Sequence, residues 1–299
     1  MARALASIMA GEGIGTTRLT AEQEDAYAVW SQPPYWDFLT GTWPLKGTKT
    51  RPAVPIWWTM DQDLKRERPM PKEGYKYARD ALLEPIFCWS PQHETDRETW
   101  WVNKSRKVLG TLWLVSGAGA EVIFRDAVSW KLVKGKREEA TDLIVERLRF
   151  AINHPNYPEW LRRYRPIRPK PVARFARYRP GSPAGTFVSM LSSVGVNFGT
   201  KEAKGGTNDF IIDEAPEVEG LRAAVEAARP GARRIIMIGT PPEPGAKGKR
   251  FDPDSVAYMR EGIEGKEPSR YRRRDDVDMT GVEEEDDEVE DDADLIGAL

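Results

Sequence analysis

The sequence contains little of the chemistry on which many enzymes and binding domains depend. Among 299 residues it has one cysteine, Cys88, and two histidines, His93 and His154. A single cysteine excludes an internal disulfide and a cysteine-based zinc site, and Cys88 is expected to be a core thiol. Two histidines argue against a multi-histidine metal site and a Ser-His-Asp triad. Any metal is therefore expected to have oxygen ligands, which favours Mg²⁺.

Long apolar runs are also missing. No stretch approaches the roughly 20 apolar residues that a helix needs to span a bilayer. The first residues, Met1-Ala2-Arg3-Ala4-Leu5, are soon followed by glycine and glutamate, so no secretory signal is expected. A mean hydropathy of -0.58 and 31% charged residues indicate a soluble protein without membrane contact. The 40% of hydrophobic residues is enough to form the core of one large domain or two small ones.

The formal net charge of -2 hides an uneven distribution. The segment Glu283–Asp294 holds ten acidic residues and no basic ones, so the remainder carries a net charge of about +8. A basic body with a separate acidic tail is typical of proteins that bind nucleic acid. A solubilising tail on an ordinary domain fits the charge pattern equally well.

Apolar periodicity predicts strands that alternate with helices. The predicted strands cover residues 98–102, 121–124, 185–190, 210–212 and 234–238, and the predicted helices cover 20–31, 74–84, 109–117, 136–152 and 218–228. This alternation predicts an α/β fold with a parallel sheet flanked by helices.

Composition divides the chain into four segments. Residues 1–20 are expected to be a disordered N-terminus, and residues 263–299 a disordered acidic tail. Residues 21–95 form a part rich in tryptophan and proline, and residues 96–262 form the α/β core. The tryptophans of residues 30–60 are expected to pack in the core, the alternative being a surface that stacks on adenine or on a partner.

The run Phe210-Ile211-Ile212-Asp213-Glu214-Ala215 combines a buried-strand pattern with two adjacent acids. The acids are expected at the carboxyl end of the strand, where α/β sheets bind ligands. One carboxylate there can hold Mg²⁺ and the next can orient a water, as in the Walker B motif of P-loop NTPases. A strand that runs into an acidic turn is the alternative.

Two other segments suit a nucleotide site. Residues Lys104–Thr111 lie between a predicted strand and a predicted helix, the place of a phosphate-binding loop. The standard pattern G-x-x-x-x-G-K-[ST] is absent, so Lys104, Arg106 and Lys107 would supply charge and Thr111 the hydroxyl. Gly239 and Thr240 end a further strand, where Thr240 would sense the γ-phosphate.

A basic segment with interleaved aromatic residues is a second candidate site. Arg162, Arg163, Arg165, Arg168 and Lys170 are its candidate DNA-binding residues. Such a pattern suits phosphate neutralisation and base stacking. A solvated Pro-rich connector is the alternative.

Residues 75–245 resemble the ATPase half of the large subunit of tailed-phage terminases, the motors of viral DNA packaging. Five segments carry this resemblance. Lys104-Ser105-Arg106-Lys107-Val108-Leu109-Gly110-Thr111 resembles a deviant Walker A loop, and Glu138–Leu143 with Arg147–Phe150 resembles the segment after the family's second strand. Pro158-Glu159-Trp160-Leu161-Arg162 resembles the family's P-E-W-L-R, Ile211-Ile212-Asp213-Glu214-Ala215 its Walker B, and Ile238-Gly239-Thr240-Pro241 its coupling motif. Lys107 departs from the glutamine usual in the family.

The resemblance implies a helicase-like P-loop ATPase core that uses ATP and Mg²⁺. Lys104 and the backbone of Ser105, Arg106, Lys107, Val108, Leu109, Gly110 and Thr111 would hold the phosphates. Thr111 and Asp213 would hold Mg²⁺, and Glu214 would polarise the attacking water. Arg106 would stabilise transition-state charge, and Gly239 with Thr240 would couple hydrolysis to DNA movement.

The resemblance also implies partners and a place of action. These are double-stranded DNA, a portal protein, a small terminase subunit and a homo-oligomeric ring, all in the host cytoplasm with transient association to the procapsid. The family's spaced nuclease acids have no counterpart after residue 245, because Glu283–Asp294 is one continuous run. We therefore expect a separate nuclease subunit or a lost one. Another helicase-like DNA-dependent ATPase, or a catalytically inactive structural or regulatory protein, remains an alternative.

Overall fold

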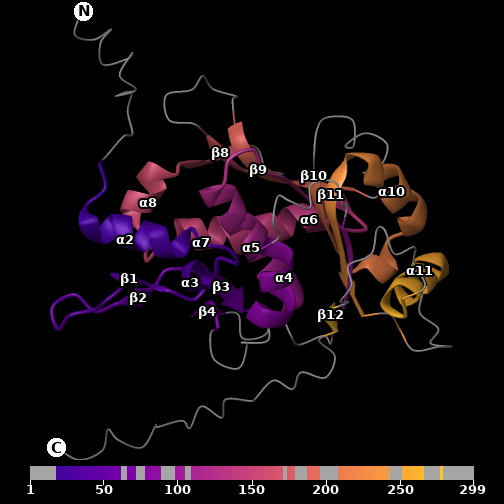
Figure 1. Ribbon diagram of the computed structural model, residues 1–299, viewed down its shortest axis with the longest axis horizontal. Coiled ribbons are helices and arrows are strands. Elements are labelled where there is room, and N and C mark those ends of the chain that lie inside the picture. Colours follow the sequence, from indigo (N-terminus) through magenta and orange to yellow (C-terminus); the bar gives the residue numbers. More distant parts are fainter. Residues whose placement is uncertain are drawn as a thin grey trace, which may run out of the picture.

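An eight-stranded sheet organises the fold (Figure 1). The computed structural model describes residues 18–61, 66–71, 78–88, 98–104, 109–170, 174–178, 187–195, 208–240, 242, 251–265 and 277–278. The sheet order is β12-β5-β11-β10-β6-β9-β8-β7. Its strands are β5 (Glu98–Asn103), β6 (Ser129–Val133), β7 (Ile167–Lys170), β8 (Arg174–Tyr178), β9 (Phe187–Val194), β10 (Asn208–Asp213), β11 (Ala232–Gly239) and β12 (Val277–Asp278).

The sheet is parallel from β12 to β9, and β8 and β7 extend it in antiparallel fashion. Helices connect and cover the strands: α5 (Gly110–Phe124), α6 (Arg137–Leu143), η3 (Ile144–Arg149), α7 (Phe150–Asn153), α8 (Glu159–Tyr164), η5 (Ala215–Glu217), α10 (Leu221–Ala228), η6 (Arg229–Gly231) and α11 (Pro253–Ile263). The predicted α/β sheet flanked by helices is confirmed.

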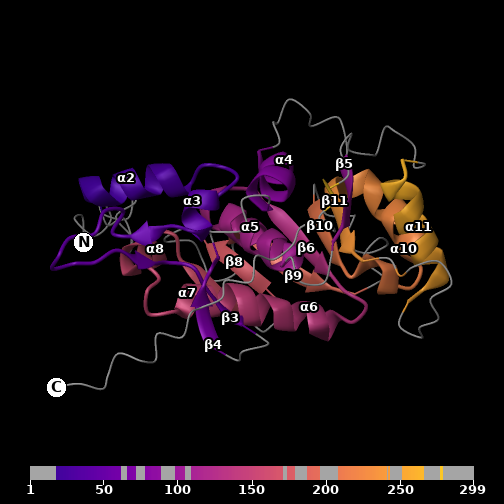
Figure 2. The ribbon, with the colours of Figure 1, turned by 90° about the horizontal axis from the view of Figure 1, so that it is seen from below.

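Alternating strand residues supply two hydrophobic layers, one on each face of the sheet. Trp100, Ile211 and Ile236 face a core that includes α5. Trp101 and Ile212, one position along on two of the same strands, face the layer covered by α10 and α11. Successive strand side chains point to opposite faces, so both faces of the central strands are buried. Figures 1 and 2 show α10 and α11 on the side of β10 and β11 opposite to α5.

The N-terminal part packs on the outer side of α5. Its elements are α2 (Ala21–Trp30), α3 (Trp36–Leu39), β1 (Thr42–Trp43), β2 (Val54–Pro55), β3 (Trp58–Asp61), β4 (Arg66–Pro69), η1 (Ala78–Leu83) and α4 (Glu84–Phe87). Trp30, Trp36 and Trp57 are buried, and Trp36 stacks on Trp113 of α5 with ring centroids 4.9 Å apart. These three tryptophans therefore have the predicted core role. Cys88 is exposed, so its predicted place in the core is wrong.

The largest error in the secondary structure predicted from the sequence concerns helix α5. The predicted strand at residues 121–124 is the last turn of this helix, which runs from Gly110 to Phe124. Almost every residue of α5 is buried, and a helix that is apolar all round shows no periodicity to reveal it. The β-branched residues Val122 and Ile123 favoured a strand, and tertiary packing overrides that propensity. The next strand is β6, which residue patterns did not reveal.

Other predicted elements agree with the structure in kind. Thr20 caps α2, and its hydroxyl accepts a hydrogen bond from the backbone N–H of Gln23, as predicted for a helix over 20–31. The predicted helix over 136–152 is the continuous run of α6, η3 and α7. The basic segment is not a connector throughout, because it forms the end of α8, the edge strand β7 and the neighbouring strand β8. Pro169 is tolerated in β7, which lies at the edge of the sheet.

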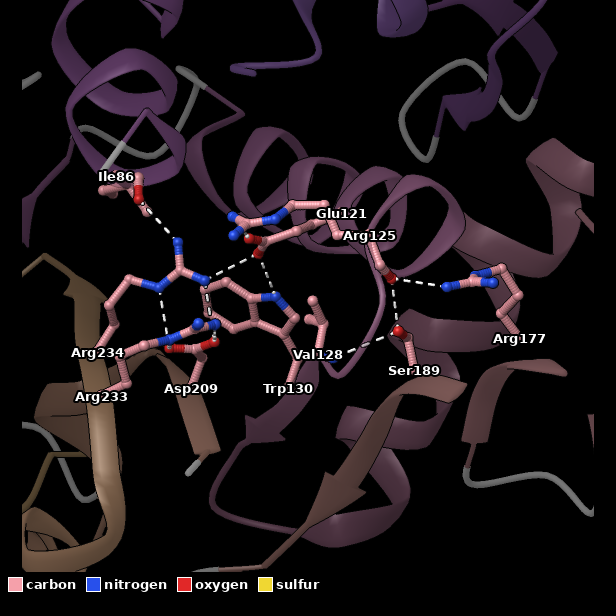
Figure 3. A network of polar contacts seen from close by, with 10 residues as sticks. All are labelled: Ile86, Glu121, Arg125, Val128, Trp130, Arg177, Ser189, Asp209, Arg233 and Arg234. Carbon is pink, nitrogen blue, oxygen red and sulfur yellow. Dashed lines mark hydrogen bonds and ion pairs between the residues drawn. The ribbon is translucent and has the colours of Figure 1, made fainter. Parts of the chain in front are cut away.

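A buried network of charges ties the amino ends of β10 and β11 to the C-terminal part of α5 (Figure 3). Arg234 donates to Asp209 and, at 2.9 Å, to Oε2 of Glu121. Trp130 of β6 donates to the same Glu121 oxygen at 2.8 Å. Asp209, Glu121 and Arg234 are each at most 1% exposed. The network fixes β6 and also α5, β10 and β11, whose opposite ends carry predicted site residues.

Over the residues that the structure describes, none of the helices has both the length and the apolar character needed to cross a membrane.

Candidate nucleotide site

Three of the predicted segments meet at one edge of the sheet. Strands β5, β11 and β10 are parallel neighbours, so their carboxyl ends lie side by side. In register, Gly239 of β11 lies opposite Asn103 of β5, and Asp213 of β10 lies opposite Ile238. One strand, β11, separates the acidic strand β10 from β5, which precedes the candidate phosphate loop, and this order suits a P-loop NTPase-type sheet.

A chain of hydrogen bonds joins the loop to the acidic strand. The ammonium of Lys104 lies 3.0 Å from the hydroxyl oxygen of Thr111 and donates to it. That hydroxyl donates to Oδ1 of Asp213 at 2.6 Å. Asp213 is 102 residues further along the chain and only 3% of its side chain is exposed. The structure thus brings together the lysine, hydroxyl and carboxylate that sequence reasoning assigned to one site.

The strand β11 reaches the same loop through its final residues. The backbone N–H of Lys104 donates to the carbonyl oxygen of Gly239 at 3.2 Å. The hydroxyl of Thr240 donates to the carbonyl oxygen of Lys104. Gly239 and Thr240 therefore contact the backbone of Lys104, at the start of the candidate phosphate loop.

Two residues of the site hold left-handed backbone conformations that non-glycine residues seldom adopt. Leu109 has φ of 53° and immediately precedes α5, and Glu214 has φ of 53° and immediately follows β10. Such conformations cluster where a fold must aim a group at a ligand. Glu214 is 33% exposed in its side chain, whereas Asp213 is buried. At this turn, the side chain of Asp213 is therefore buried while that of the adjacent Glu214 is partly exposed to solvent.

Lys134 is a residue of the site that sequence reasoning missed. It directly follows β6, and its ammonium lies 3.0 Å from Oδ2 of Asp213 and 3.9 Å from Oε2 of Glu214. Burial lowers the pKa of Lys134, but the charges of Asp213 and Glu214 outweigh burial and the net direction is upward. Lys134 therefore carries a positive charge at neutral pH. Correct placement of β6 beside β10 would have revealed it.

Four predicted loop residues, Ser105, Arg106, Lys107 and Val108, lie outside the described residues. Gly110 and Thr111 form the first turn of α5, a helix of 15 residues. The first backbone N–H groups of a helix have no intrahelical acceptor and favour anions such as phosphate. The described part of the loop therefore supplies a helix N-terminus, a lysine and a hydroxyl.

The predicted DNA-binding residues lie far along the sheet, beside its antiparallel edge. Arg162 donates to the carbonyl of Ile152, and Arg165 contacts Tyr27, so both support the fold. Arg163 is 65% exposed and pairs with Glu159 on the surface of α8. Arg168 and Lys170 belong to β7, and their side chains lie outside the described residues.

The donor groups at this edge fit Mg²⁺ and a phosphate chain. A hydroxyl and a carboxylate, 2.6 Å apart, are hard oxygen ligands of the kind that Mg²⁺ prefers. Among the described residues no group of three His, Cys, Asp or Glu side chains forms a metal site made of protein alone. Thr111 and Asp213 match the protein share of a Mg²⁺ site that phosphate oxygens and water complete.

The close packing around Gly239 at this edge of the sheet can be tested by substitution. A Cβ at Gly239 would lie 2.4 Å from Cδ of Pro216 and 3.3 Å from the backbone nitrogen of Ala215. We expect Gly239→Ala to push apart β11 and the turn that carries Glu214, at a cost of about 1–3 kcal/mol in unfolding free energy. Denaturant unfolding measures this cost.

Gly135→Ala is the matched control, because a Cβ at Gly135 would meet no atom within 4 Å. It is expected to leave unfolding unchanged within ~0.5 kcal/mol. Equal stability of Gly239→Ala and the wild type would contradict the close packing of the turn.

Comparisons with known proteins find similar chains among solved structures. Neither a protein-family model nor a curated protein matches the chain. The chain is similar to an alanine variant of the ATPase domain of the Thermus phage P74-26 large terminase, with 13% identity, 70% of this chain and 80% of that chain covered, and a TM-score of 0.42. A second structure of that ATPase domain gives 13% identity, coverages of 66% and 83%, and a TM-score of 0.38.

Proposed function

We propose that this chain hydrolyses ATP as the motor subunit of viral DNA packaging. The observation that carries the ATPase part is the hydrogen-bonded chain from Lys104 through Thr111 to Asp213, with Glu214 next to it. Two segments about 100 residues apart in the sequence, Lys104–Thr111 and Asp213–Glu214, supply these groups, and each has the residue types that phosphoryl transfer requires. The packaging part is supported by the order of the motifs that resemble those of terminase large subunits.

Each residue has a role in the proposed reaction. Lys104 and the N-terminus of α5 bind the phosphates, together with the loop residues Ser105–Val108. Thr111 and Asp213 hold Mg²⁺, which when bound neutralises charge that develops on the phosphates. Glu214 orients the attacking water and accepts its proton. Thr240, bonded to the Lys104 carbonyl, transmits the state of the loop to the rest of the sheet.

The proposal includes the partners that the motif resemblance implies. These are double-stranded DNA, a portal protein and a small terminase subunit, with the active form a ring of identical chains at the procapsid in the host cytoplasm. Arg163, Arg168 and Lys170 are the proposed DNA contacts. Arg106 is proposed to stabilise the transition state.

Release of phosphate from ATP tests the proposal. We expect the chain to hydrolyse ATP in the presence of Mg²⁺, to be faster with added duplex DNA, and to stop when EDTA removes the metal. The presence of DNA unwinding would favour a helicase instead. No binding of ATP by equilibrium dialysis would contradict the proposal and leave an inactive protein with the same fold.

A further inference from the structure

The second oxygen of Asp213 is already occupied by a cation of the protein itself. Oδ1 of Asp213 accepts from the hydroxyl of Thr111 at 2.6 Å, and Oδ2 lies 3.0 Å from the ammonium of Lys134. Asp213 is 3% exposed in its side chain and Lys134 is 14% exposed. Because both are so little exposed, water screens their attraction weakly, and the carboxylate is neutralised without any metal.

Position in the sheet explains why Lys134 reaches this carboxylate. Strands β6 and β10 are parallel neighbours, and Val133 lies opposite Ile212. Lys134 directly follows Val133 and Asp213 directly follows Ile212, so the two side chains leave the same edge of the sheet side by side. The lysine is held near the acid by the register of the sheet and not by a flexible loop.

Among the residues that the structure describes, the charged groups of this hydrogen-bonded cluster are equal in number. Two ammonium groups, of Lys104 and Lys134, lie with two carboxylates, of Asp213 and Glu214. Adding a divalent cation beside Asp213 would bring it next to the Lys134 ammonium, and like charges at such short range repel strongly. The hydroxyl of Thr111 is itself neutral and can bind a cation together with the carboxylate, although the Lys104 ammonium lies 3.0 Å from its oxygen.

From these contacts we propose that Lys134 is the counter-cation of Asp213 in the metal-free protein, and that Mg²⁺ displaces its ammonium when it binds. The inference rests on the proposed function, because it concerns the same carboxylate. Glu139, in the first turn of α6, is a further carboxylate whose charge acts on Lys134. Together with Glu214, it offers the displaced ammonium another negative charge. Lys134 thus sets how much Mg²⁺ the site requires.

Substitution of Lys134 by methionine tests this exchange. Methionine keeps much of the length of the side chain and removes its charge. A fluorescent ADP analogue is titrated with MgCl₂ into the full chain, and bound fluorescence reports the Mg²⁺ concentration at half-saturation. We expect Lys134→Met to lower that concentration by about tenfold, equivalent to ~1.4 kcal/mol. In EDTA, the same variant is expected to melt at a lower temperature than the wild type, and saturating Mg²⁺ should narrow the difference.

Lys136→Met is the matched control, because it removes one positive charge from an exposed residue two positions away. It is expected to keep the wild-type Mg²⁺ requirement. Lys134→Gln serves as a second uncharged variant if Lys134→Met does not fold. An unchanged or higher Mg²⁺ requirement in the uncharged variants overturns the exchange while leaving the nucleotide site intact. Absence of any Mg²⁺-dependent binding in the wild type overturns the proposed function as well.

Discussion

Glu214→Gln is expected to lower the rate of ATP hydrolysis by about 10²–10⁴-fold while ATP binding remains near the wild-type level. Glutamine has nearly the shape of glutamate and can still contact a water, but it cannot accept a proton. The groups proposed to bind nucleotide and metal, Lys104, Thr111 and Asp213, are joined to one another without Glu214. Phosphate release measures turnover, and equilibrium binding of ATP measures affinity.

Two outcomes distinguish a role in the chemical step from a general effect on the fold. Glu219→Gln is the control, because Glu219 is exposed and lies five residues further along. It is expected to retain wild-type turnover. Hydrolysis at the wild-type rate by Glu214→Gln would show that Glu214 does not orient the water. Loss of both binding and turnover would show instead that the turn after β10 has been disturbed.

The acidic strand was predictable because its pattern combines burial with chemistry. Three apolar residues before Asp213 identify a strand covered on both faces, and the acids can only project from its end. The loop before α5 was predictable in position from the same reasoning. That Thr111, and not another hydroxyl, contacts Asp213 follows once the helix begins at Gly110.

Lys134 could not be predicted, because its role depends on which strands are neighbours. The error at residues 121–124 placed a strand where α5 ends, and β6 itself, Ser129–Val133, was missed. Its lysine therefore had no position at the edge of the sheet. Strand order is determined by long-range packing, and local periodicity carries little information about it. The sequence therefore predicted the acids and the loop of the candidate site, but not Lys134, whose ammonium pairs with those acids.

The buried network of charges at the amino ends of β10 and β11 could not be predicted for the same reason. A substitution in this network has the largest effect on stability that we expect. Asp209 accepts hydrogen bonds from Arg233 and Arg234, and Arg234 also donates to the backbone carbonyl of Ile86 at 2.9 Å (Figure 3). Burial alone would raise the pKa of Asp209, but Arg234 first and then Arg233 hold it below the ordinary value. Asp209 is therefore ionised in the folded protein at neutral pH.

Asp209→Ala is expected to lower the free energy of unfolding by about 3–5 kcal/mol, because it leaves the guanidinium of Arg234 buried without its main counter-charge. Glu261→Gln is the control. It removes a carboxylate from an exposed pair with Arg222, whose side chains are 42% and 49% exposed, and should cost less than ~1 kcal/mol. Urea unfolding measures both. Equal losses in the two variants would mean that burial of the network contributes nothing.

The pH dependence of the unfolding free energy provides a second, independent test of this prediction. The pKa of Asp209 is lower in the folded than in the unfolded chain, so the folded state holds the carboxylate ionised where the unfolded state begins to bind a proton. Its contribution is then complete above the unfolded pKa, about 3.9, and is lost as the pH falls through the lower folded pKa. The stability difference between wild type and Asp209→Ala should therefore be constant from neutral pH to about 5 and shrink below about 4. A difference that stayed constant to lower pH would assign the loss to packing around Asp209 and not to its charge.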